Sequence, residues 1–131
     1  MSHVTHATAA RLKAAGFPQP AFATGQFWYN QYGEASFVGR RDVLEKTGDE
    51  TFFCTSVRSG RTEEFTPIHD GSFFAPTATD ILRELPARFS LSIRPIEGGV
   101  LFLAGEQESF GHVSKNPAEA CAAAWLAIHE K

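Results

Sequence analysis

Apolar residues first recur with helical spacing at residues 5–15, where Ala9 and Leu12 share one face. Gly16 follows this segment and Pro18 lies just beyond it, which is a common way for a helix to end. The pattern therefore predicts a first helix at 5–15.

From residue 26 the spacing changes to the two-residue alternation of β-strands. Runs of this kind, separated by turn residues such as Gly33 and Gly60, occupy four segments: 26–32, 35–38, 51–57 and 62–66. They predict an antiparallel meander. The pattern at 41–46 fits either one helical turn or a strand extension, and both alternatives stay open.

Two further helices flank a second group of strands. Thr77 and Asp80 match a capping box, so we expect a helix from Thr77 to Pro86. Three alternating runs predict a hairpin and a third strand: 89–94, 100–104 and 109–114. Asn116 followed by Pro117 predicts the start of a last helix that continues to residue 129.

The last helix has one apolar stripe, formed by Ala118, Cys121, Ala122, Trp125 and Ile128. We expect Cys121, Trp125 and Ile128 to pack against the sheet, and the charged groups of Glu119, Glu130 and Lys131 to stay in water. The predicted element order is α-ββββ-α-βββ-α. Because the helices separate groups of antiparallel strands instead of alternating singly with strands, the fold class is α+β.

Length and composition then bound the possibilities. A chain of 131 residues predicts a single domain, 1–131, whose C-terminal half at 77–131 is an α-β-β-β-α unit. The net charge of −3 disfavours a general nucleic-acid coat, and no apolar run is long enough for a membrane span. Cys54 and Cys121 lack the spacing of a disulfide framework or zinc module, so we expect reduced thiols and a cytoplasmic location.

Consecutive aromatic residues are the most unusual feature. Neighbouring strand residues point to opposite faces, so the run 27–29 cannot enter one core as a whole. One explanation is a sheet covered on both faces, by the later helices on one side and by the first helix or a second subunit on the other. The alternative is an exposed partner-binding patch of Trp28, Tyr32 and either Phe52 or Phe53. A stacking platform for bases lacks the positive stripe that accompanies one.

Four arginines are expected to project from one end of the first sheet: Arg40, Arg41, Arg58 and Arg61. Arg58 and Arg61 bracket what looks like a two-residue hairpin turn. Such guanidinium groups can bind phosphate or carboxylate, so these residues are a candidate anion site. Ordinary solvated turn arginines explain the same pattern, and two glutamates directly after this turn would neutralise part of the charge.

Catalytic and metal-binding patterns do not stand out. The five histidines lack zinc-binding spacing. A turn explains the polar groups around His69 better than a catalytic relay does, and a polar strand face explains the acids near His112. Gly98 and Gly99 precede a strand rather than a helix, so they predict a hairpin turn and not a phosphate loop. We therefore expect no enzyme activity, no cofactor and no metal.

Two segments resemble proteins of one kind. Residues 76–86 follow the pattern P-x-x-x-D-I-L-x-x-L-P, and the last helix begins N-P-A-E-A and later contains Trp125 and Leu126. In this they resemble small uncharacterised proteins of bacteria and their phages or mobile elements, over about residues 73–131. The resemblance implies an accessory role without naming a mechanism, and it transfers no functional residue.

Residues 77–131 are also similar, in their order of elements, to the double-stranded-RNA-binding domain. Where that family has a basic start to its last helix, only Lys115 is basic here, and Pro117 and Glu119 follow. The hairpin, strand and last helix resemble HicB-type antitoxins, whose half-domains keep this topology for protein contacts. The resemblance implies a partner-binding module.

Together these features predict a small, non-catalytic, cytoplasmic accessory protein that binds another protein and forms a homodimer. The alternatives are an RNA-binding or HicB-like module, and a phage protein that sequesters a small phosphorylated ligand with its arginines. Binding to RNA would weaken steeply with salt, whereas an aromatic protein interface would change little.

Overall fold

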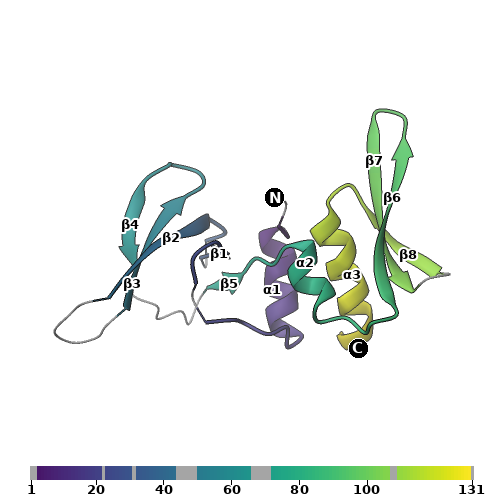
Figure 1. Cartoon of the computed structure of the whole chain (residues 1–131), viewed down its shortest axis with the longest axis horizontal. Helices are drawn as coiled ribbons and strands as arrows, with labels where there is room; N and C mark the ends of the chain where they lie inside the picture. The colour runs from purple at the N-terminus through teal and green to yellow at the C-terminus, as the bar shows by residue number, and fades with distance from the viewer. Residues whose placement is uncertain are drawn as a thin grey trace. The chain divides into compact units, whose positions relative to one another are not determined.

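The computed structural model of the chain describes residues 3–21, 23–30, 32–43, 50–65, 72–106 and 109–130. Within these ranges the side chains at 40–43, 50–52, 63–65 and 109–110 are not described. The chain forms two compact units, Pro18–Ala75 on the one hand and Met1–Phe17 with Pro76–Lys131 on the other. The fold class is α+β, as predicted, with two antiparallel sheets (Figure 1). That the chain is a single domain stays a prediction.

The unit Pro18–Ala75 is a five-stranded antiparallel sheet of order β4-β3-β2-β1-β5. Its strands are β1 (Phe27–Tyr29), β2 (Ala35–Val43), β3 (Glu50–Ser56), β4 (Thr62–Phe65) and β5 (Phe73–Phe74). The first four are the predicted meander. Strand β5 occupies a segment in which the sequence predicted only a connection, because the backbone of residues 73 and 74 pairs with β1. Residues 41–43 extend β2, and 44–46 lie outside the described residues.

Strand β2 reaches this length through an irregularity after Val38, where its pairing with β3 shifts register. Gly39 lies at the shift, and a Cβ atom added there would come within 2.9 Å of the carbonyl oxygen of Phe53. A side chain at this position would push the two strands apart, so the close approach of β2 and β3 requires glycine.

The aromatic residues of this sheet divide between its two faces. Trp28 pairs in register with Phe74, and their ring centroids are 5.5 Å apart. One residue earlier on β1, Phe27 pairs with Phe37 on β2, and their ring centroids are 5.2 Å apart. Trp28 and Tyr29 are adjacent in sequence, point to opposite faces and are both buried. The consecutive aromatic residues therefore serve two separate packing layers.

The second unit contains three helices and a three-stranded sheet of order β6-β7-β8. Its elements are α1 (His6–Ala14), α2 (Ala78–Leu82), β6 (Phe89–Ile96), β7 (Gly99–Glu106), β8 (Ser109–Ser114) and α3 (Pro117–His129). Helix α3 contacts α1 and α2 as well as β7 and β8 (Figure 1). It is therefore buried on more than the single stripe that was predicted, and Ala120 and Ala124 are also fully buried.

The predicted helix starts are confirmed by their hydrogen bonds. The Thr77 hydroxyl accepts from the Asp80 N–H, and the Asp80 carboxylate accepts from the Thr77 N–H at 3.0 Å. The side-chain oxygen of Asn116, Oδ1, accepts from the Ala118 N–H at 2.9 Å. Asn116 also donates through its amide to the His3 carbonyl at 3.0 Å, a contact that no local pattern predicts.

Two further contacts hold the N-terminal segment in this unit. The Val4 N–H donates to the Pro76 carbonyl at 3.2 Å, and the Phe17 ring meets the Trp125 ring edge-on with centroids 5.1 Å apart. The Phe17 N–H also donates to the Leu12 carbonyl, so the chain turns back over the end of α1. Helix α1 thus packs with the C-terminal half of the chain, with which the sequence had not grouped it.

The expectations for α3 need one correction. Cys121 and Trp125 are buried as predicted, and Ile128 is half-buried. Glu119 does not stay in water, because its carboxylate accepts from the Thr8 hydroxyl at 2.8 Å and the Thr5 hydroxyl at 3.2 Å at the start of α1. Glu130 is exposed and forms an ion pair with Arg11, and Lys131 lies outside the described residues. Among the described residues, no helix is long and apolar enough to cross a bilayer.

Candidate functional site

The predicted aromatic patch does not form as expected. Trp28 retains only 7% of its surface, because it packs on Phe74, whereas Tyr32 is 80% exposed. Strand β1 ends at Tyr29, so Tyr32 lies in the following turn and no longer continues the alternation from Trp28. Phe53 is half-buried on β3, and the side chain of Phe52 lies outside the described residues.

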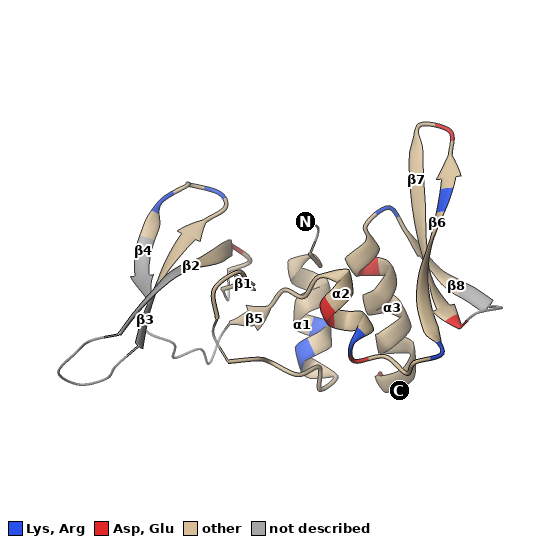
Figure 2. Ribbon diagram, viewed as in Figure 1, with Lys and Arg blue, Asp and Glu red and all other residues tan. Residues whose placement is uncertain are grey.

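Two of the four predicted anion-binding arginines lie on the turn between β3 and β4, where Figure 2 shows basic residues. The turn is longer than expected, because the Ser56 N–H donates to the Arg61 carbonyl and four residues lie between them. Arg58 is exposed and forms an ion pair with Glu34 at 3.7 Å. Arg61 lines a pocket. The side chains of Arg40 and Arg41 lie outside the described residues.

This pocket, called here the polar pocket, has a volume of about 280 Å³. Its floor comes from Ser36 on β2 and from Cys54 and Ser56 on β3. Ser36 and Ser56 are directly paired, and Cys54 is two residues before Ser56, so all three share one face of the sheet. The rim comes from the turns at either side, through Asn30, Glu34, Ser59 and Arg61.

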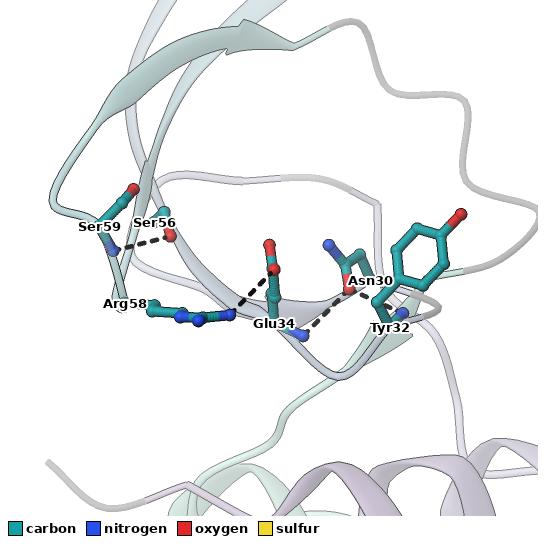
Figure 3. A network of polar contacts seen from close by, with 6 residues as sticks. All are labelled: Asn30, Tyr32, Glu34, Ser56, Arg58 and Ser59. Carbon is teal, nitrogen blue, oxygen red and sulfur yellow. Dashed lines mark hydrogen bonds and ion pairs between the residues drawn. The ribbon is translucent and has the colours of Figure 1, made fainter.

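The turns around the polar pocket are held by their own side chains (Figure 3). The side-chain oxygen of Asn30, Oδ1, accepts from the backbone N–H groups of Tyr32 at 2.9 Å and Glu34 at 3.0 Å. On the opposite turn, the Ser56 hydroxyl accepts from the Ser59 N–H at 3.3 Å, and the Ser59 hydroxyl accepts from the Arg61 N–H at 3.2 Å. Local hydrogen bonds therefore fix the side chains that line the pocket.

The two thiols are poor nucleophiles in this fold. Burial raises the pKa of the Cys54 thiol, which lies in the polar pocket, above its ordinary value. Burial raises the pKa of the Cys121 thiol, within α3, to about 11. Both thiols are free and protonated near neutral pH, and the thiol form is far less reactive than the thiolate. In the part of the chain that the structure describes, no group of acids, histidines and cysteines is placed to hold a metal ion.

A second candidate surface is the outer end of the hairpin β6–β7, which extends past the N-terminal end of α3 (Figure 1). Four apolar residues at this end, named here the hairpin end, are exposed: Ile93, Pro95, Ile96 and Val100. The register pairs Pro95 with Val100 and Ile93 with Phe102, so Ile93, Pro95 and Val100 lie on one face. Ile93 is 61% exposed, and charged residues are few along the hairpin (Figure 2).

Sequence reasoning missed both the hairpin end and most of the polar pocket. The patterns predicted strands at 89–94 and 100–104, so they did not indicate that β6 and β7 continue to Ile96 and Gly99 at the hairpin end. The serines of the polar pocket come together because Ser36 pairs with Ser56, and this pairing register was not readable from the sequence.

Comparison of the chain with protein-family models, with curated proteins and with solved structures finds no match. The resemblance of residues 73–131 to small phage and mobile-element proteins therefore stays a prediction.

Proposed function

We propose that the chain is a non-catalytic protein that acts by binding another protein, and that its partner is a second copy of itself. The observation that carries the proposal is the hairpin end. The aliphatic side chains of Ile93 and Val100 are exposed on one face of the hairpin end and that of Ile96 on the other, and no described element of the same unit covers them. Exposed apolar groups gathered in one place mark interaction surfaces, because their burial against a partner is favourable.

The contact is expected through the side chains of the hairpin and not through strand addition. Strand β6 is at the edge of its sheet, which would in principle offer free backbone groups to another strand. Pro95 stands in this edge strand and has no N–H to donate, and it also restricts the backbone of its neighbours. A partner strand would therefore lose part of its hydrogen-bond ladder.

The composition of this face supports a second copy as the partner. At the hairpin end, the face with Ile93, Pro95 and Val100 carries no charged residue, because Arg94 lies on the opposite face with Ile96, and Glu97 lies in the turn. A two-fold symmetric interface buries the same patch of both copies, and an uncharged apolar patch is complementary to itself.

The test is sedimentation equilibrium of the full chain over a wide concentration range, with the double variant Ile93→Ser, Val100→Ser. We expect the parent to form a dimer and the variant to dissociate at least about tenfold more readily, because two apolar anchors are lost. Val113→Ser is the matched control, since Val113 is 52% exposed on β8 of the same sheet and lies outside the hairpin end. A parent that stays monomeric at all concentrations, or a double variant that dimerises like the parent, overturns the proposal.

An RNA-binding function has less support. The order α2-β6-β7-β8-α3 is the one that the double-stranded-RNA-binding resemblance implied, but the start of α3 provides only Lys115 as a cation. The Glu119 carboxylate there accepts from Thr8 and adds negative charge where phosphate would lie. A cytoplasmic location remains part of the proposal, and it is supported by two buried free thiols, which are typical of a reducing compartment.

A further inference from the structure

Several side chains that line the polar pocket have hydrogen-bond donors to spare. The Asn30 oxygen accepts two backbone N–H groups, and the hydroxyls of Ser56 and Ser59 accept one each. The Asn30 amide is left with its NH₂ group, and each serine keeps the proton of its hydroxyl to donate. These groups and the Arg61 guanidinium can therefore donate to a ligand.

The described charged groups at the pocket leave it with a net positive charge. Glu34 is the only acid that lines it among the described residues, and its carboxylate is paired with Arg58. Arg61 also lines the pocket, and no acid whose side chain the structure describes pairs with it. Among the charged groups whose side chains the structure describes at the pocket, Glu34, Arg58 and Arg61 sum to one positive charge. The Cys54 thiol adds no negative charge near neutral pH, because burial raises its pKa.

These features decide which ligands fit. A metal ion or an ammonium group would lie beside the Arg61 guanidinium, and Glu34, the one described acid that lines the pocket, is already paired with Arg58. An apolar ligand would leave the hydroxyl and guanidinium donors without partners. An oxyanion satisfies them, since a guanidinium group binds two oxygens of a carboxylate or phosphate in parallel.

We propose that the polar pocket is a binding site for a small molecule that carries a phosphate or carboxylate group. The anionic oxygens accept hydrogen bonds from the Arg61 guanidinium and from the hydroxyl groups of Ser56 and Ser59. A volume of about 280 Å³ restricts the ligand to a compact molecule, at the lower end of ligand-binding pockets. The polar pocket lies in a different unit from the hairpin end, so this proposal does not depend on whether the chain self-associates.

The proposal is tested by titrating the full chain with inorganic phosphate and, separately, with succinate, at constant ionic strength maintained with chloride. Amide chemical shifts of residues 56–61 in ¹⁵N–¹H NMR spectra report binding at the site. We expect saturable shifts there with at least one of the two probes, and the stronger probe identifies phosphate or carboxylate as the preferred group. No saturable shift with either probe overturns the proposal.

Variants distinguish specific binding at the polar pocket from nonspecific electrostatic attraction of anions to the protein. Arg61→Gln should weaken binding about tenfold or more, and Arg61→Lys should fall between it and the parent, because lysine keeps the charge and loses the planar fork. Arg83→Gln is the matched control, since Arg83 is exposed and the substitution makes the same charge change in the other unit. Ser59→Ala removes both the hydroxyl donor and the acceptor of the Arg61 N–H without any change of charge, and it should also weaken binding. Binding that Arg61→Gln leaves unchanged, or that Arg83→Gln weakens equally, contradicts the proposal.

Discussion

Removal of the Trp125 side chain is the strongest test of how the second unit is held together. Trp125 retains 3% of its surface and meets the Phe17 ring edge-on, with centroids 5.1 Å apart. On its other side it stacks on His129, with ring centroids 3.8 Å apart. Truncation therefore removes a large buried apolar surface and two ring contacts, one of which ties α3 to the end of α1.

The expected magnitude follows from these contacts. Truncation of a buried aromatic side chain to alanine costs about 3–5 kcal/mol, through lost burial and through the cavity left behind. Natural domains are stable by only about 5–15 kcal/mol, so Trp125→Ala should lose a large part of the total. Trp125→Phe keeps a ring against Phe17 and should lose about 1–2 kcal/mol.

The assay is urea unfolding of the full chain, followed by far-UV circular dichroism, with the free energy of unfolding obtained by linear extrapolation. Ala123→Ser serves as the control, because Ala123 is exposed on the same helix and a substitution there should change stability by less than about 0.5 kcal/mol. A loss below about 1 kcal/mol for Trp125→Ala would show that the ring is not part of the core, and the assignment of α1 to this unit would lose its main support.

Three further predictions follow from single observations. Asn116→Ala loses both the helix cap and the bond to the His3 carbonyl, so its free energy of unfolding should fall by about 1–2 kcal/mol. Asn116→Ser keeps a cap, loses only the amide bond to His3 and should lose less; equal losses of the two variants in urea unfolding would assign no role to the cap. Burial raises the pKa of the Cys121 thiol from 9.0 to about 11 in the folded state, so the unfolded chain loses this proton first as the pH rises. The free energy of unfolding should therefore fall between these two pH values, and it should fall less in Cys121→Ala. Identical pH profiles of the two proteins would argue against a buried thiol. Finally, Trp125→Phe leaves Trp28, in the unit Pro18–Ala75, as the single tryptophan. If the chain is one domain, Trp28 fluorescence and far-UV circular dichroism should report the same unfolding midpoint in this variant, and two different midpoints would contradict the single-domain prediction.

Much of the local structure was predictable from the sequence, and the helix ends show why. Thr77 with Asp80, and Asn116 with Pro117, act through hydrogen bonds and backbone restrictions that span at most four residues. Strand positions were predictable for the same reason, because alternation is read from neighbouring residues. From the positions and types of elements, the α+β class followed directly.

The candidate sites were predictable only in part. Arg61 was proposed as part of an anion site at a turn, and it lines the polar pocket. The serines and Asn30 that accompany it come together through the register of β2 and β3, which is set by pairing between separate segments. Trp28 shows the same limit. Its alternation with Tyr32 predicted an exposed pair, whereas pairing of β1 with the distant β5 placed Phe74 beside Trp28 and buried it.

The sequence by itself determined where the helices begin, where most strands lie and which fold class they form, since these depend on interactions between near neighbours. Only the tertiary structure decided that α1 packs with the C-terminal half of the chain, that Glu119 bonds to Thr8 and that the hairpin end extends beyond α3. Burial is a property of segments brought together from distant parts of the chain. A residue's own neighbours in sequence therefore do not reveal whether its side chain will reach water.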